Sequence, residues 1–109
     1  YNWIEISSYG TPIPFNDDDQ NLGPFLIGFT FQFYGVDFLT FRVCTNGFAS
    51  FTSAANPWTN LSIPNTAEPN NLLAAFWDDF NFTDSGSAYY YTNNIDTLIV
   101  EWQNAPRYD

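Results

Sequence analysis

Six aspartates are the residues of this chain whose type and spacing could do chemistry. They form two groups, which are Asp17, Asp18 and Asp19, and Asp78, Asp79 and Asp84. Both groups lie in polar stretches that favour loops. Carboxylate oxygens on flexible loops are the ligands that Ca²⁺ prefers, so calcium is the candidate metal, and no other cofactor is expected. Because the spacing matches no EF-hand loop, two solvated acidic loops are the alternative interpretation.

Aromatic side chains are the second group with a chemical use. They make up 21% of the residues, and an exposed ring can stack on a sugar while nearby amides and carboxylates bind its hydroxyl groups. The candidates for ligand contacts are Trp58, Tyr34, Tyr89 and Tyr91, whereas Tyr90 points away from its two neighbours. Packing or a protein interface is the alternative use of such rings. On that interpretation the core holds Trp3, Trp77 and Trp102.

Catalytic side chains are scarce. The chain has no histidine, which removes Ser-His-Asp and Cys-His catalysis and the commonest zinc ligand. Its one cysteine, Cys44, has no histidine or lysine to activate it, so we expect a small buried strand residue. A glycosidase would need two carboxyl groups across a cleft, and the sequence pairs none of Glu5, Glu68 and Glu101 with another. The sequence therefore predicts no enzyme and no catalytic residue.

The charge balance restricts the partners. Twelve acidic residues and two arginines give a formal net charge of −10. Nucleic acid needs a basic footprint, so it is excluded, and an anionic lipid surface is disfavoured. No run of about 18 apolar residues occurs, so we expect no membrane insertion. Strong acidity fits an extracellular or cell-surface protein. The sequons at Asn60 and Asn81 are then candidate glycosylation sites, although chance sequons are common in an Asn-rich chain.

Alternating side chains predict the strands that position these residues. The clearest strand runs from Phe25 to Phe33, where inward and outward positions alternate with a period of two. Gly28 on its outer face indicates a bulge or a close neighbour. Further strands are expected at Trp3–Ile6, Phe38–Cys44, Phe48–Thr52, Leu72–Trp77, Ser87–Thr92 and Asp96–Trp102. Tyr9–Pro14 reads as irregular or an edge, and Ser53–Asn71 as a long functional or crossover loop.

The Asn46-Gly47 pair predicts the central hairpin. Both residues tolerate positive φ, which favours a type I′ turn between two apolar strands. The residues expected to face the core before the turn are Leu39, Phe41 and Val43. Arg42 lies on the opposite face, where we expect it to pair with a carboxylate such as Glu101 or Asp37.

Six or seven strands around one core, without a long amphipathic helix, determine the predicted fold class. It is all-β, an antiparallel β-sandwich of jelly-roll or immunoglobulin-like type. At this length one domain spans residues 1–109.

Four strings in a fixed order carry a family resemblance. They are Phe31-Gln32-Phe33-Tyr34-Gly35, Cys44-Thr45-Asn46-Gly47-Phe48, Pro69 to Asp79, and Ile99-Val100-Glu101-Trp102. The chain resembles a β-sandwich module repeated in large secreted and surface proteins of bacteria, and it is more distantly similar to the nidogen-like extracellular domain. The resemblance implies an extracellular, non-catalytic module of adhesion, and it supplies no catalytic residues.

One departure from that pattern shapes the expected function. Modules of this kind usually continue past Trp102–Tyr108 with a further hairpin, whereas this sequence stops at Asp109. We therefore expect an incomplete sandwich with an exposed edge, closed by a strand from a partner. The expected partners are other copies of the chain or other surface proteins, which makes it a self-associating subunit of a surface assembly or filament. The alternative to an incomplete sandwich is that the sequence is a fragment of a longer protein. A carbohydrate-binding module, with glycans as partners, is the alternative function.

Overall fold

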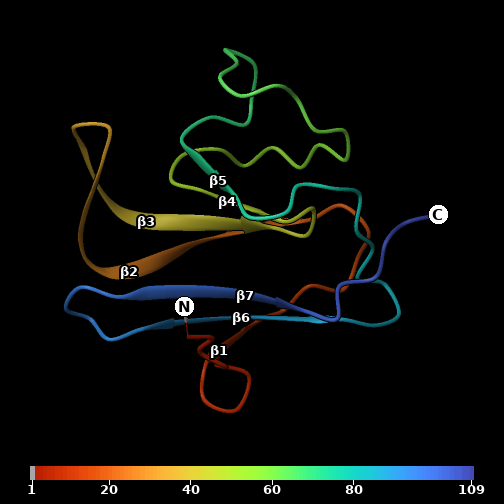
Figure 1. Ribbon diagram of the computed structural model, residues 1–109, viewed down its shortest axis with the longest axis horizontal. Helices are drawn as coiled ribbons and strands as arrows, with labels where there is room; N and C mark the ends of the chain where they lie inside the picture. Colours follow the sequence, from red (N-terminus) through yellow and green to blue (C-terminus); the bar gives the residue numbers. More distant parts are fainter. Residues whose placement is uncertain (1) are drawn as a thin grey trace.

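The computed structural model describes residues 2–109 and contains two antiparallel sheets (Figure 1). The strands are β1 (Thr11–Ile13), β2 (Asn21–Phe33), β3 (Val36–Cys44), β4 (Phe48–Ser50), β5 (Leu72–Ala74), β6 (Ser87–Thr92) and β7 (Leu98–Gln103). Over the described residues there is no helix, and hence none that could cross a membrane. The predicted all-β sandwich is confirmed.

The strands are ordered β1-β6-β7 in one sheet and β2-β3-β4-β5 in the other. Figure 1 shows the sheets as two layers, with the loop over residues 53–71 beyond the β2–β5 layer. The core lies between the layers, because each sheet turns one apolar face inward. Its buried members are Ile13, Ile27, Phe41, Val43, Phe51 and Ala88.

The alternation predicted for the longest strand is confirmed in β2. Ile27 is fully buried while its neighbour Leu26 is 71% exposed. The pairing of β2 with β3 is irregular between Leu26 and Phe31. Within this irregularity Gly28 has φ +87°, and a Cβ there would lie 2.3 Å from Asn94 Oδ1. The glycine therefore marks both an irregular ladder and a close neighbour, as predicted.

The inward face of β3 is only partly as predicted. Phe41 and Val43 are buried, but Leu39 is 61% exposed, so that expectation was wrong. The register shift against β2 explains the difference, because it changes which side chains face inward at the far end of the strand. Phe38 takes the inward place and stacks on Phe51 with ring centroids 5.2 Å apart.

The turn at Asn46-Gly47 also differs from its prediction. β3 ends at Cys44 and β4 begins at Phe48, so the loop has three residues, and of its members Gly47 has positive φ while Asn46 does not. A three-residue loop that ends in a left-handed glycine is a common hairpin connection, but it is not type I′. Positive φ at both positions occurs instead at Tyr34 and Gly35, between β2 and β3.

Three predicted strands are shorter or missing. The strand expected at Phe48–Thr52 ends at Ser50. Residues 3–6 form no strand, because the Ile6 amide donates to the Glu101 carboxylate and the Ser7 amide to Glu5, rather than to a neighbouring strand. Trp3 is 65% exposed, so its place in the core was wrong too. The strand expected at Leu72–Trp77 ends at Ala74. Beyond it the Phe76 amide bonds to the Gly47 carbonyl, in the β3–β4 loop.

Arg42 makes no ion pair with Glu101 or Asp37, which corrects that expectation. Its Nε donates to Asn21 Oδ1 at 2.9 Å, and its Nη2 donates to the Asn21 carbonyl at 3.0 Å. The arginine still fixes the start of β2 against β3, as a neutral amide serves the same geometric purpose as a carboxylate. Cys44 is fully buried as predicted.

The strands expected at Ser87–Thr92 and Asp96–Trp102 are confirmed as β6 and β7, which form an antiparallel hairpin. Their register is unbroken, from Ser87 opposite Gln103 to Thr92 opposite Leu98. Leu98, Val100 and Trp102 alternate along β7 and pack against the core. Tyr90 points inward and packs on Phe25 and Phe41. Its neighbours Tyr89 and Tyr91 therefore lie on the outer face.

Candidate functional site

The Asn46 side chain joins three loops at one end of the sandwich. It is fully buried, and its Nδ2 donates to Asp19 Oδ1 at 2.8 Å and to the carbonyl oxygens of Asn56 and Pro57 at 3.3 and 3.2 Å. Its Oδ1 accepts the amide hydrogen of Phe80 at 3.0 Å. Because both ends of the amide have partners, this residue fixes the acidic loops relative to one another.

Gly47 lets the loop after β5 approach the hairpin. A Cβ at this position would lie 2.0 Å from the Phe76 carbonyl oxygen, and φ is +84°. The Phe76 amide donates to the Gly47 carbonyl at 3.1 Å. No side chain fits such a contact, so glycine is required here for close approach as well as for the turn.

Three of the six predicted metal ligands converge beside Asn46. Carboxylate oxygens of Asp18, Asp19 and Asp79 lie within 4.8 Å of one another. They line a cavity of about 210 Å³ together with Trp58 and Tyr108. The other three predicted ligands do not join this group of converging oxygens. Asp17 accepts the Asp18 amide, Asp78 pairs with Arg107 at 3.3 Å, and Asp84 is exposed.

The electrostatics of this acidic cavity are unfavourable without a counter-charge. Burial, followed by the neighbouring carboxylates, raises the pKa of Asp18 and of Asp79, while Arg107 partly opposes the shift of the Asp79 pKa. Asp18 Oδ1 is shielded from solvent and has no hydrogen-bond partner. Three converging carboxylates could supply part of the six to eight oxygens of a calcium site, with carbonyl oxygens and water completing it. These residues are the ones that could hold a metal.

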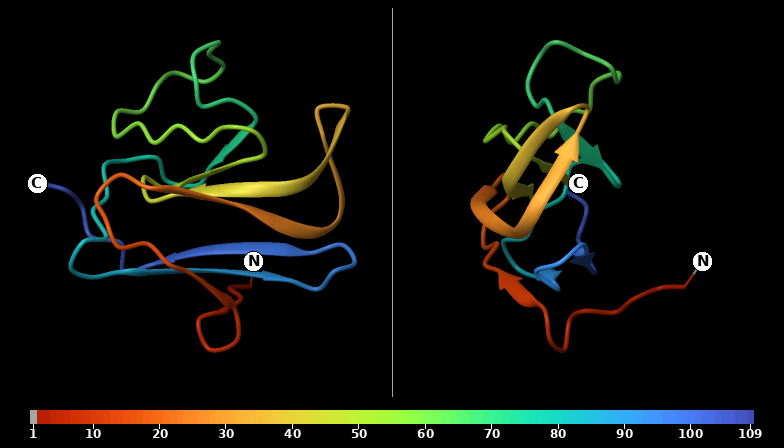
Figure 2. Two further views of the ribbon diagram at one scale, coloured as in Figure 1. Left: turned by 180° about the vertical axis from the view of Figure 1, so that it is seen from behind. Right: turned by 90° about the vertical axis from the view of Figure 1, so that its left-hand side faces the viewer.

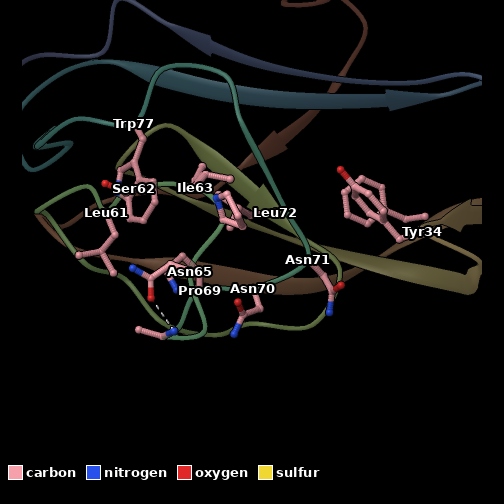
Figure 3. Close-up of a pocket in the computed structure, with 13 residues that line it drawn as sticks. Tyr34, Leu61, Ser62, Ile63, Asn65, Pro69, Asn70, Asn71, Leu72 and Trp77 are labelled. Atoms are coloured by element: carbon pink, nitrogen blue, oxygen red, sulfur yellow. Dashed lines mark hydrogen bonds between the residues drawn. The ribbon is translucent and has the colours of Figure 1, made fainter.

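The four aromatic ligand candidates lie in different places. Trp58 is 60% exposed at the acidic cavity, whereas Tyr34 is 91% exposed and lines a separate cavity of about 210 Å³ beneath the long loop. Figure 3 shows Tyr34 at one end of that cavity and Leu61 at the other. Tyr89 and Tyr91 lie on the outer face of β6, where Tyr91 packs edge-on against Tyr9 at 5.2 Å. The structure therefore does not bring the four rings into one platform.

Both candidate glycosylation sites take part in hydrogen bonds within the chain. Asn60 is exposed in the long loop, and its Nδ2 donates to the Trp77 carbonyl at 3.0 Å. Asn81 is half-buried, and its Oδ1 accepts the Thr83 amide at 2.9 Å.

An apolar groove along the open side of the sandwich was not predicted as a site. Two cavities of about 250 and 210 Å³ lie between β7 and the edge of the other sheet, and they share Phe51, Leu73 and Leu98. The sequence did place function at an unclosed edge after Trp102. The structure locates the open edge at β7 itself, because β6 is its neighbour on one side and the described residues place no strand on the other.

A carboxyl pair links the N-terminal segment to β7. Glu101 is 4% exposed, its Oε2 accepts the Ile6 amide at 3.2 Å, and its Oε1 is shielded from solvent without a hydrogen-bond partner. Burial and then Glu5 raise the pKa of Glu101, while hydrogen bonds from Ser7 and then Glu101 lower the pKa of Glu5 to about 2. The opposite shifts of the two pKa values favour a proton on Glu101, which would then let this side chain donate to the Glu5 carboxylate. The sequence offered Glu5 and Glu101 only as separate carboxyl groups, and no local signal indicated that they would meet.

Comparisons with known proteins give one match. A family model described as NIDO related matches residues 1–108. No curated protein and no solved structure matches the chain.

Proposed function

Because the chain belongs to the NIDO-related family, we propose that it is an extracellular, non-catalytic structural module that associates with further copies of itself in a surface assembly. The family supports an extracellular structural role. A thiol that cannot readily ionise fits the absence of catalysis, since burial raises the pKa of Cys44 to about 11.

The edge of β7 is the observation that carries self-association. A sheet edge invites pairing with another chain unless it is short, bulged or interrupted by proline. β1 has three residues and contains Pro12, β5 has three residues, and β2 contains Pro24 and register shifts. β7 has six residues with no proline, glycine or lysine and an unbroken register with β6. Among the edges that the structure describes, it is the one without such protection.

The apolar groove beside β7 adds a driving force. Leu73 is 49% exposed on the far wall of the groove, and Leu98 lies on the near wall. A chain laid along β7 would gain backbone hydrogen bonds from the edge and bury apolar surface in the groove, at about 25 cal/mol for each Å² removed from water.

Sedimentation velocity over a concentration series tests this proposal. We expect reversible association, which Ile99→Lys weakens by placing a charge on the β7 edge. Thr30→Lys is the matched control, because Thr30 is exposed on β2 and the same charge there leaves association unchanged. A wild-type chain that stays monomeric at every concentration would sink the proposal.

Carbohydrate binding is the second candidate function, and the exposed Tyr34 ring favours it. The cavity that Tyr34 lines combines apolar side chains with the amides of Asn65, Asn70 and Asn71, a mixture that suits a sugar. Glycan-array binding that Tyr34→Ala abolishes and Tyr89→Ala leaves intact would support it. A blank array removes this candidate.

We also propose that the acidic cavity binds Ca²⁺ to stabilise the loops that Asn46 joins. The convergence of Asp18, Asp19 and Asp79, with one shielded oxygen lacking a hydrogen-bond partner, favours this role. The experiment is a comparison of melting temperatures in Ca²⁺ and in EDTA, and equal values would exclude the site.

A further inference from the structure

We propose that β7 pairs antiparallel with β7 of a second copy about a two-fold axis that passes beside Val100, so that the two three-stranded sheets join into one. This inference rests on the proposed self-association and specifies its geometry. A two-fold contact uses the same patch on both copies, so an unprotected edge that can pair with itself needs no second surface.

The faces of β7 restrict the register. Leu98, Val100 and Trp102 point to the core side, whereas Ile99 and Glu101 point to the outer side. Residues directly opposite each other in an antiparallel pair project from the same face. A two-fold pair must therefore place a single residue opposite itself, because a one-residue slip would turn the apolar row outward.

Three residues near the middle of the strand could occupy the axis, and charge and the length of β7 decide among them. Centring on Glu101 would place two buried carboxyl groups opposite each other, which is unfavourable. Centring on Ile99 would place Trp102 opposite the partner's Asp96, beyond the end of β7. Centring on Val100 places Leu98 opposite the partner's Trp102 and keeps the whole apolar row paired.

The same register places the remaining charges favourably. Ile99 faces the partner's Glu101 on the outer side, and Asp96 faces the partner's Asn104 rather than a carboxylate. Within Leu98–Gln103 the ionisable side chain is Glu101, which is 4% exposed and accepts the Ile6 amide. The edge is therefore almost free of exposed charge, although each copy carries a formal net charge of −10. Because that wider repulsion is screened by salt, we expect association to strengthen as salt rises.

The N-terminal segment lies on the correct side to extend this contact. Trp3 and Ile4 are 65% and 54% exposed. Figure 2 shows the segment before β1 leaving the body on the side of β7 and continuing past that strand. In the paired dimer it would pass over the outer face of the partner strand, near the partner's Ile99, and cover apolar surface that is otherwise in water.

Single cysteines on β7 test the axis directly. A disulfide needs Cα atoms within about 7 Å, a condition that a residue meets with its own copy only when it lies beside the axis. We expect Val100→Cys to give a covalent dimer on mild oxidation. Ile99→Cys and Glu101→Cys are the matched controls, because each would cross-link only if the strand were centred there. The native Cys44 is fully buried and common to all three variants.

The outcomes separate this inference from the proposed function. Cross-linking that is strongest at Ile99→Cys or Glu101→Cys, or absent from all three folded variants while the wild type dimerises, overturns the register and leaves self-association standing. A wild type that never associates removes both the register and the proposed self-association.

Hydrogen exchange on the wild type tests the pairing without any variant. The amides of Leu98–Gln103 should gain protection as concentration rises, whereas those of β1 should not, and equal behaviour of both edges would also overturn the pairing.

Discussion

The Asn46 amide and the Asp19 carboxylate, separated by 27 positions in the chain, are joined by a hydrogen bond of 2.8 Å. The same amide accepts the backbone hydrogen of Phe80, next to Asp79. One buried side chain thus sets the spacing of the two loops that supply the acidic cavity. The hairpin tip acts in this way as a structural support for the candidate metal site.

Replacing Asn46 with aspartate should strongly destabilise the protein. The new carboxylate keeps the size of the amide but cannot donate to Asp19, and it adds a negative charge to a buried acidic cluster. Loss of buried hydrogen bonds costs about 1–3 kcal/mol for each group left unsatisfied, so we expect a loss of about 3 kcal/mol or more in the free energy of unfolding. Urea denaturation measures it. Asn65→Asp, at an exposed loop position, makes the same change of charge and should cost little.

Gly47→Ala and Gly35→Ala form a matched pair, because both glycines have positive φ. An alanine at Gly35 meets nothing within 4 Å, so it should cost only the left-handed strain of about 1–2 kcal/mol. An alanine at Gly47 adds a clash with the Phe76 carbonyl oxygen and must displace the loop after β5. We expect Gly47→Ala to lower the melting temperature clearly more than Gly35→Ala. Equal decreases in melting temperature would show that the close approach of Phe76 to Gly47 does not contribute to stability.

The sequence predicted the sandwich because its signals were local. The alternation in β2 and the β6–β7 hairpin each follow from neighbouring side chains, and both are confirmed. The errors arose where long-range contacts decide. Leu39 faces outward because the register of β2 and β3 shifts. Residues 3–6 form no strand because the Ile6 amide donates to Glu101, 95 positions along the chain, rather than to a neighbouring strand.

The sequence predicted which residue types make up the candidate site but not their arrangement. Six aspartates were named from the sequence, but which of them converge depends on Asn46, whose side chain contacts residues from three loops. The Asn46-Gly47 pair had been interpreted as a turn signal alone. Its buried amide could not be foreseen, because nothing local to the hairpin indicates which loops will pack on it.

Asp79→Asn should have opposite effects with and without calcium. Burial and neighbouring carboxylates raise the pKa of Asp79, so its ionised form disfavours folding, and the stability it contributes at low pH is lost as pH rises through the raised pKa. In EDTA at neutral pH, the asparagine should therefore raise the melting temperature slightly. In Ca²⁺ it should remove a ligand and abolish any stabilisation by the ion. Asp84→Asn, outside the cluster, should preserve the calcium response, and an identical response of both variants would contradict the assignment.

Glu101→Gln should remove a pH dependence that the carboxyl pair creates. The pKa of Glu101 is raised in the folded chain, so its contribution to stability is complete below the pKa of the unfolded chain and is lost as pH rises through the raised value. The Glu5 pKa is lowered to about 2 from its ordinary 4.5, so its contribution is present above 4.5 and lost as pH falls through about 2. The pair is therefore most stabilising at mildly acidic pH, where one proton is shared, and weakens towards neutral pH.

A glutamine at position 101 can donate to Glu5 and accept the Ile6 amide at any pH, whereas an alanine can do neither. Thermal melts between pH 4 and 8 should show a fall in stability with rising pH for the wild type that is reduced in Glu101→Gln. At pH 7 the melting temperature of Glu101→Gln should equal or exceed that of the wild type. At mildly acidic pH the melting temperature of Glu101→Ala should lie below that of the wild type. If the two variants behave alike across this range, Glu101 does not donate to Glu5, and the N-terminal segment must be held against β7 by other contacts, such as the burial of Ile6 and the hydrogen bond from Gln103 to Glu5.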